Sequence, residues 1–272
     1  ANARVLTESV EQQQSAGSAV YRGLSYVERV RGSDGAAESD DILATSNERS
    51  EKVVDIVRLN TRTGRKQLLT ANVPGEVQDW VLDHDGVPRV AIMQPSGTEA
   101  IVLYREGADA PWNEIHRAQL GPDSFDPGLF NFVPLAFTAD NKSLYVASNQ
   151  GGRDRAAIFK FDPVQKIFGE LIAEHPMFDV TGDLRFGRDG KTLVGVSINA
   201  DRPMTKWFDP EYTRIQKMLD STFPATYNTF TRTSIGGDPK ALVVSRSDRQ
   251  PARYYLFDDA KRTLEEILST ND

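Results

Sequence analysis

A turn signature that recurs about every fifty residues is the feature that most constrains the fold of this chain. Four segments begin with an aspartate, continue with residues suited to a tight turn and lead into an apolar strand, and they start at Asp85, Asp140, Asp189 and Asp238. Asp followed by Gly or Asn tolerates the positive φ of tight hairpin turns. Pro239 cannot adopt positive φ, so the turn at Asp238 must be of another type. A regular repeat of this length predicts one supersecondary unit per copy.

A second signature, a strand followed by a polar turn and another strand, accompanies each copy of the first. In one copy, residues 54–59 lead through the polar turn at 60–64 to Leu68. The same arrangement occurs over 101–115, 157–172 and 254–268. Two inner and two outer strands per repeat are typical of the blade of a β-propeller. We therefore predict an all-β fold, a β-propeller of four-stranded blades.

The repeat predicts about five recognisable blades. One blade ends near Leu69, and the others cover residues 77–118, 132–174, 177–227 and 228–270. Residues 1–30 are expected to hold part of an earlier blade, through 20–21 and 24–27, so the count leaves open whether the propeller is complete. We treat residues 1–272 as a single propeller domain or a fragment of one.

Two segments depart from the repeat. Residues 33–41 contain four acidic side chains and no basic one, which favours a solvated loop. Residues 209–219 predict one short inserted helix, because Asp209 suits the N-cap, Pro210 the first turn and Glu211 the positive end of the helix dipole. The apolar side chains of this segment fall on one helical face at Tyr212, Ile215, Met218 and Leu219.

Composition narrows the classes of partner and of chemistry. The 272 residues carry a net charge of −7 without a long basic run, so nucleic acid and anionic membranes are poor partners. The chain has no cysteine, and therefore no disulfide and no thiolate ligand or nucleophile. Ala1 is neither an initiator Met nor part of an apolar signal sequence, so we expect a chain that was processed or cut from a longer one. The location stays open between a bacterial cytoplasm and periplasm.

Catalytic motifs are sparse. Residues 195–199 match the first half of the Gly-x-Ser-x-Gly nucleophile turn, but Asn199 replaces the last glycine inside a strand of the repeat. The chain has three histidines, His84, His116 and His175, and they show no metal-ligand spacing. We therefore expect no catalytic residue, no metal site and no cofactor within these residues.

Two acidic pairs and one glycine-rich loop are candidate sites. Asp40–Asp41 and Asp258–Asp259 fall in predicted turns, where adjacent acids are usually solvated rather than placed across a glycosidase cleft. The loop at 151–155, Gly-Gly-Arg-Asp-Arg, lacks the Lys-Ser/Thr of a phosphate loop. Loops between strands gather at the two ends of a propeller, so this loop is either a flexible connection or a charged contact surface.

Several motifs resemble a known family. Residues 137–145, followed by Ser148-Asn149 and 158–162, are similar to the propeller repeat of TolB-like proteins and of prolyl oligopeptidase family peptidases. Residues 200–203, 207–212 and 215–216, together with 79–83 and 85–89, resemble the bacterial dipeptidyl aminopeptidase/acylaminoacyl-peptidase branch of that family. The resemblance runs from about residue 40 to the end of the chain.

The resemblance implies a division of labour between two domains. In that family a propeller precedes an α/β-hydrolase domain that carries a Ser-Asp-His triad, and it limits access to short or unfolded peptides. Here the hydrolase is expected after Asp272, so no triad residue is carried over and these 272 residues are not themselves expected to be an enzyme. Peptide substrates and the chain's own hydrolase domain are the implied partners. The candidates for substrate or domain contact are Asn149, Arg153, Asp154, Arg155, Trp207 and Tyr212.

Two alternative functions and one possible mode of association stay open beside this interpretation. A stand-alone TolB-like propeller would act as a scaffold that binds other proteins, and it shares the Asp-Gly-Lys-x-Leu repeat. A propeller glycosidase would instead need a central cluster of acids that binds sugars. Open blade edges would also allow pairing with another chain, and thus an oligomer.

Overall fold

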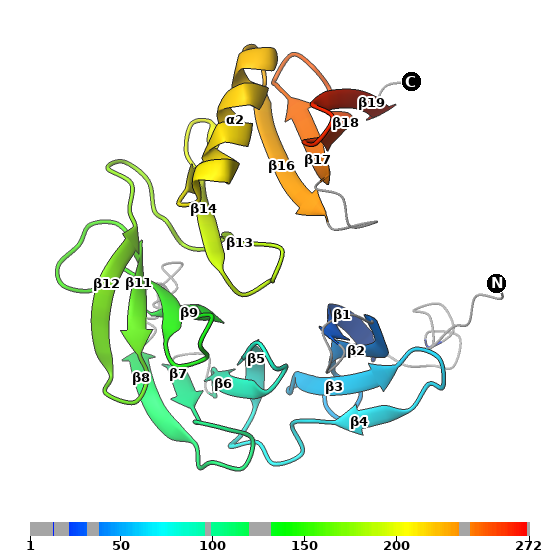
Figure 1. Cartoon of the computed structure of the whole chain (residues 1–272). Coiled ribbons are helices and arrows are strands. Elements are labelled where there is room, and N and C mark those ends of the chain that lie inside the picture. The colour runs from blue at the N-terminus through cyan, green and yellow to red at the C-terminus, as the bar shows by residue number, and fades with distance from the viewer. Residues whose placement is uncertain are drawn as a thin grey trace. The chain divides into compact units, whose positions relative to one another are not determined.

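The computed structural model describes residues 13, 22–31, 38–95, 99–119, 132–233 and 240–270. Over these residues the chain forms five antiparallel sheets, each built from strands that are consecutive in the sequence (Figure 1). This arrangement confirms the predicted β-propeller fold with blades of four antiparallel strands. Blade 1 holds β1 (Leu24–Arg31), β2 (Glu38–Ser46), β3 (Asp55–Asn60) and β4 (Lys66–Leu68). Blade 2 holds β5 (Val77–Leu82), β6 (Pro88–Met93), β7 (Glu99–Tyr104) and β8 (Asn113–Gln119).

The other three sheets follow the same order. Blade 3 holds β9 (Val133–Phe137), β10 (Leu144–Ser148), β11 (Ala157–Asp162) and β12 (Ile167–Ala173). Blade 4 holds β13 (Leu184–Phe186), β14 (Leu193–Asn199) and β15 (Pro203–Trp207). Blade 5 holds β16 (Tyr227–Thr233), β17 (Lys240–Arg246), β18 (Arg253–Asp258) and β19 (Thr263–Ser269). The helix α2 (Pro210–Thr222) lies in the chain between blades 4 and 5.

The hairpin turns between the first and second strands of the blades have the predicted chemistry. Gly86, Asn141 and Gly190 all adopt positive φ, at 77°, 58° and 67°. In the turn before Thr192, the Asp189 carboxylate accepts hydrogen bonds from two main-chain N–H groups that the turn exposes. The repeat was therefore visible in the sequence because each copy needs the same local backbone conformation. Asp238 and Pro239 lie outside the described residues.

A second local device recurs where the second strand of a blade ends. The hydroxyl oxygens of Ser46, Ser148 and Ser247 each accept a hydrogen bond from the main-chain N–H two residues later, at 3.1–3.2 Å. Ser46 and Ser148 are the last residues of β2 and β10, and Ser247 follows the end of β17. These short turns direct the chain away from the sheet at the same point of three blades.

Two predictions about the first blade were wrong. Residues 24–27 do not belong to an earlier blade, because they lie in β1, where Leu24 pairs with Ser46 of β2. Residues 38–41 are not a loop, because β2 begins at Glu38. The acids Asp40 and Asp41 are accommodated in this strand by basic partners farther along the chain, which local sequence composition does not reveal.

Blade 4 differs from the other blades in the described part of the chain. Its sheet has three strands, and the chain continues from β15 into α2 instead of a fourth strand. The inserted helix was predicted, and it begins as expected: the Asp209 side chain accepts hydrogen bonds from the N–H groups of Glu211 and Tyr212 at 2.8 and 3.2 Å. Its buried residues are Tyr212, Ile215 and Leu219, the apolar face that the sequence predicted.

The chain divides into two compact units. The first comprises residues 1–137 and 163–166, and its core joins blades 1 and 2. Trp80 is central there, because its indole N–H donates to the Val54 carbonyl at 2.6 Å and its ring packs 5.8 Å from that of Trp112. The buried guanidinium of Arg89 donates to the Tyr104 hydroxyl at 2.7 Å and lies over the Phe137 ring, which ties β6 to β7 and β9.

The second unit comprises residues 138–162 and 167–272, and its core lies around α2. The buried face of the helix packs on Val194 of β14 and on Phe230, Val243 and Phe257 of blade 5. Because the helix contacts both sheets, its burial joins blade 4 to blade 5 within this unit.

Candidate functional site

The loop that joins β10 to β11 is the first candidate from the sequence. Gly151 and Gly152 both adopt positive φ, at 78° and 76°, so the turn depends on residues without a Cβ. Asn149 is half-buried at the start of this loop. The structure therefore gives residues 149–155 a defined turn rather than an irregular connection.

The charged side chains of this loop are engaged to different degrees. Arg153 forms an ion pair with Glu174, and its guanidinium lies 5.5 Å from the centre of the Phe159 ring, which fixes it against blade 3. Arg155 pairs with its neighbour Asp154 at 2.9 Å, and the Asp154 side chain is 83% exposed. Asp154 and Arg155 thus remain accessible to a partner, whereas Arg153 stabilises the loop.

Trp207 and Tyr212 have a structural role. Their rings pack 5.1 Å apart, and each also contacts the Phe230 ring of blade 5. Tyr212 is only 8% exposed, and this burial raises the pKa of its phenol. The Trp207 indole N–H donates to the Gln216 side chain at 3.2 Å, which ties the end of β15 to α2. That these aromatic residues also contact a partner stays a prediction.

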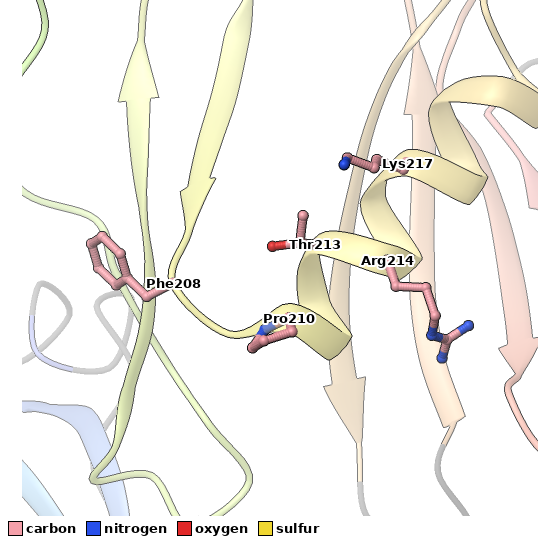
Figure 2. Close-up of a pocket in the computed structure, with 5 residues that line it drawn as sticks. All are labelled: Phe208, Pro210, Thr213, Arg214 and Lys217. Atoms are coloured by element: carbon pink, nitrogen blue, oxygen red, sulfur yellow. The ribbon is translucent and has the colours of Figure 1, made fainter.

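A pocket of about 450 Å³ lies along the exposed face of α2. It is lined by Phe208, Pro210, Thr213, Arg214 and Lys217 (Figure 2). Thr213 and Lys217 project from the side of α2 toward the segment that carries Phe208, as Figure 2 shows. The helical residues of this set occupy positions i, i+3, i+4 and i+7, so they share the face of α2 opposite its buried one. The sequence carries this signal, because the period that marks the apolar face also places these residues together on the opposite face.

The pocket is basic. Arg214 donates from one terminal nitrogen to both carboxylate oxygens of Asp259, at 2.8 and 2.7 Å, and its charge is thereby compensated. Lys217 is exposed, and Lys206 of β15 lies 5.7 Å from the centre of the Phe208 ring. Neither lysine has a carboxylate partner among the described residues. The pocket thus combines apolar walls with the uncompensated ammonium group of Lys217, and the ammonium group of Lys206 lies beside it, next to Phe208.

Neither acidic pair has the arrangement of a glycosidase site. Asp40 accepts a hydrogen bond from Arg62 at 2.7 Å, and Asp41 accepts from Arg58 at 2.6 Å. Hydrogen bonds lower the pKa of both carboxyl groups, chiefly from Arg62 for Asp40 and from Asn60 and then Arg58 for Asp41. A general acid needs a raised pKa, so this pair is suited to stabilising blade 1 rather than to proton donation.

The second pair is engaged in the same way. The pKa of Asp258 is lowered, first by the hydrogen bond from the Lys261 main-chain N–H, and Asp259 binds Arg214. The prediction that Asp258–Asp259 lies in a turn holds for Asp259, while Asp258 is the last residue of β18.

The nucleophile and base candidates are not assembled into a triad. Ser197 lies within β14, where its hydroxyl bonds Arg185 Nε at 2.8 Å and the Thr205 hydroxyl at 3.1 Å. His175 accepts hydrogen bonds at Nδ1 from the N–H groups of Met177 and Phe178, a local turn. His84 Nε2 lies 3.1 Å from the Phe137 carbonyl oxygen. These contacts give the three side chains structural roles: Ser197 bonds to side chains of neighbouring strands, and His84 and His175 contact main-chain groups.

The described residues hold neither a metal-binding cluster nor a membrane-spanning helix. No group of three or more His, Asp or Glu side chains there could hold a metal ion. No helix in the same residues is both long enough and apolar enough to span a membrane.

Comparison with known proteins identifies no family. No protein-family model matches the chain, and no curated protein does. Among solved structures, the chain is similar to TolB from Acinetobacter baumannii, with 13% identity and a TM-score of 0.34 over 91% of this chain and 44% of TolB. It is also similar to the β-propeller domain of the Trilobed protease from Pyrococcus furiosus, with 12% identity and a TM-score of 0.45 over 93% of this chain and 74% of that domain. A puromycin hydrolase mutant gives 13% identity and a TM-score of 0.46 over 90% of this chain and 37% of the enzyme.

The chain spans less than half of the length of TolB and of the puromycin hydrolase. The assignment as a propeller rests on the sheets described above, and the functions of the similar proteins are not transferred by these likenesses.

Proposed function

We propose that this chain is the non-catalytic propeller domain of a prolyl oligopeptidase family serine peptidase, and that it gates the access of peptides to a downstream α/β-hydrolase domain. The dipeptidyl aminopeptidase/acylaminoacyl-peptidase branch is part of this proposal. The mechanism is steric: rigid blades exclude folded proteins, while short or unfolded peptides reach the hydrolase.

The observation that carries the proposal is the segment from residue 200 to residue 216. It bears the most specific sequence resemblance, and in the structure it forms one ordered unit. Residues 200–203 contain the turn that leads into β15, and Asp209 and Pro210 begin α2. The motif therefore corresponds to a distinct structural element, the insertion that joins blades 4 and 5. Asp154 and Arg155, on the exposed loop of blade 3, are the accessible candidates for contact with the hydrolase.

The sequence of the encoding gene beyond codon 272 gives the first test. We expect roughly 250 further residues that include a Gly-x-Ser-x-Gly motif followed by an aspartate and a histidine. A reading frame that stops without such a segment refutes the proposal.

Activity of the full natural protein gives the second test. We expect a fluorophosphonate probe to label the serine of that motif, and we expect cleavage of short chromogenic peptides but not of a folded protein of the same local sequence. A variant with alanine at the labelled serine is the control. Equal cleavage of the folded protein and of its unfolded form would refute gating while leaving the peptidase assignment intact.

A stand-alone scaffold of the TolB-like type is the second candidate. The turn at 189–193 carries the Asp-Gly-Lys-x-Leu pattern of that repeat, and its backbone has the expected positive φ at Gly190. Absence of a downstream hydrolase, together with purification of a defined membrane or lipoprotein complex, would favour this alternative.

A further inference from the structure

We propose that the outer edge of β15 and the exposed side of α2 form a docking groove for an extended acidic peptide, which pairs with β15 as an added strand. The groove lies in blade 4, α2 and the turn after β18. Binding of a peptide there requires no hydrolase domain, so its failure and the failure of the proposed peptidase function are distinguishable. Four of the five sheets in the described chain end in a fourth strand, whereas β15 is the last strand of blade 4.

The backbone of β15 presents hydrogen-bonding groups on its outer side. The register pairs Lys206 with Val196 and Met204 with Ile198, and the N–H of Phe208 donates to the Val194 carbonyl at 2.8 Å. Even-numbered residues therefore bond to β14, and the N–H and C=O groups of Thr205 and Trp207 point outward. No fourth strand receives these groups among the described residues. An exposed edge of this kind is the template for strand addition by a peptide.

The side chains beside this edge are suited to a peptide with both apolar and charged groups. Along β15 and the residue that follows it, exposed side chains alternate with half-buried ones, so Met204, Lys206 and Phe208 share one face. Phe208 also lines the pocket, whose other walls are the helical residues Pro210, Thr213 and Lys217. A strand added to β15 would place its alternate side chains along this face and in the pocket.

The positive charge of the groove favours an occupant that carries carboxylates. The chain has a net charge of −7, yet Lys217 on the pocket wall and Lys206 beside Phe208 have no carboxylate partner in the described structure. The remaining base of the pocket, Arg214, is held by Asp259. Carboxylates on a bound peptide would compensate the two lysines, and their attraction would weaken as salt is added.

The same charge disfavours a second copy of this chain as the occupant. Pairing two β15 strands would bring the lysines of both copies to one interface, where like charges destabilise the pair. Pro203 also removes one outward N–H group from the edge, and proline and lysine are the residues by which proteins limit pairing between identical edges. An acidic peptide would instead place carboxylates beside these lysines, so the groove favours it over a second copy.

Peptide binding to the 272-residue chain tests the proposal. The probe is an acetylated and amidated octapeptide of alternating glutamate and valine, and the control probe carries lysine in place of glutamate. We expect saturable binding of the acidic probe only, measured by calorimetry at low salt. We also expect hydrogen–deuterium exchange to slow at the amides of Thr205 and Trp207 when the acidic probe is bound.

A pair of substitutions at one residue tests strand addition. Thr205→Pro removes an outward N–H group while the N–H groups that bond β14 remain, and proline is tolerated on an edge at such a position. Thr205→Val removes the same hydroxyl but keeps the N–H group, so it is the matched control. We expect the proline variant to lose binding and the valine variant to retain it. Equal binding by both variants would overturn the pairing with β15.

Charge reversal tests the selection for an acidic occupant without altering the backbone. Lys206→Glu together with Lys217→Glu is expected to weaken binding of the acidic probe about tenfold or more, because attraction becomes like-charge repulsion. Lys142→Glu, at an exposed lysine of the turn between β9 and β10, is the control and should change binding less. The proposal is overturned if the acidic probe does not bind, if reversal leaves its affinity unchanged, or if sedimentation shows that the edge is occupied by a second copy.

Discussion

Gly195 shows how closely single residues are fitted in blade 4. It pairs with Trp207 across β14 and β15. A Cβ at this position would lie 2.6 Å from Cε3 of Trp207 and 2.9 Å from the carbonyl oxygen of Lys206. The oxygen belongs to the sheet backbone and the indole is packed in the aromatic cluster, so neither group can move without breaking other contacts.

We therefore expect Gly195→Ala to destabilise the chain by about 1–3 kcal/mol, the usual cost of overpacking a core. Gly107→Ala is the matched control, because a Cβ there meets nothing within 4 Å, and its effect should stay within about 0.5 kcal/mol. Urea unfolding followed by tryptophan fluorescence measures both. A Gly195→Ala variant as stable as the natural chain would contradict the packing described here.

His116 gives blade 2 a dependence on pH. Its ring stacks on Phe132 at 4.6 Å with an interplanar angle of 11°, and its Nε2 atom is buried without a hydrogen-bond partner in the described structure. Burial is the main cause that lowers its pKa below the ordinary value of 6.5, while the charge of Glu114 acts in the opposite direction. The folded chain therefore resists protonation of this ring more than the unfolded chain does.

We expect the free energy of unfolding to fall as the pH decreases from about 6.5 toward the lower pKa of the folded state, because only the unfolded chain gains the proton there. His116→Phe keeps the stacking on Phe132 and removes the titration, so this part of the decline should disappear. Urea unfolding in buffers from pH 7 to pH 3 measures this dependence. The decline due to His116 must be separated from the loss of stability at more acidic pH that comes from Asp41 and Asp140, whose pKa values are also lowered. A decline between pH 6.5 and 5 that is the same in both proteins would contradict the assignment to His116.

At the scale of elements, α2 depends on its first turn. Asp209 closes the N-terminus with two hydrogen bonds from N–H groups, and Glu211 on that turn pairs with the buried guanidinium of Arg232 at 2.6 Å. Because Tyr212, Ile215 and Leu219 of the same helix fill the core between blades 4 and 5, loss of the cap is transmitted to packing in both sheets.

Asp209→Ala is expected to lower the free energy of unfolding by about 1 kcal/mol, the typical cost of removing an N-cap side chain. Asp209→Asn keeps an oxygen that accepts from the same N–H groups and should retain most of that stability. Thermal and urea unfolding of the two variants make the comparison. An asparagine variant as unstable as the alanine variant would mean that the charge, and not the cap, carries the effect.

The accuracy of prediction from sequence also varies with the element. The blade predicted over 77–118 corresponds to β5–β8, and the one predicted over 132–174 corresponds to β9–β12, because hairpin turns and strand alternation are local signals. The errors concern contacts between distant residues. Asp40 and Asp41 were predicted to lie in a turn, because adjacent acids are usually solvated. In the structure their charges are compensated by Arg58 and Arg62, which come from the next strand and the turn after it and are not local in the sequence.

In the candidate site, the sequence did not reveal how the aromatic residues pack, and their contact with a partner stays a prediction. Trp207 and Tyr212 were selected for contact with a partner, and the structure places them in a packed cluster that involves Phe230 of another blade. An aromatic side chain has the same sequence signature in either role, so only the fold separates them. The basic pocket was not predicted, because only the turn into α2 brings Phe208, which Lys206 approaches, to the same pocket as Lys217.

For the whole molecule, charge is the property with the widest consequence. The 32 basic residues are outnumbered by 39 acidic ones, and many arginines in the described structure are compensated by a carboxylate. Arg117 is an example, because it pairs with both Glu99 and Glu114. The uncompensated lysines of the β15–α2 groove stand on a molecule whose overall field repels polyanions.

We therefore expect the chain to bind an acidic peptide but not duplex DNA, although both are anions. Nonspecific binding of DNA requires several phosphate contacts at once, and two lysines supply too few. Electrophoretic mobility of a 30-base-pair duplex at physiological salt should stay unchanged up to about 100 µM chain, where nonspecific DNA-binding proteins already form complexes. The double variant Lys206→Glu and Lys217→Glu should behave identically with DNA while losing the peptide. A DNA complex that this variant abolishes would show that the groove recognises phosphate rather than carboxylate on an extended strand.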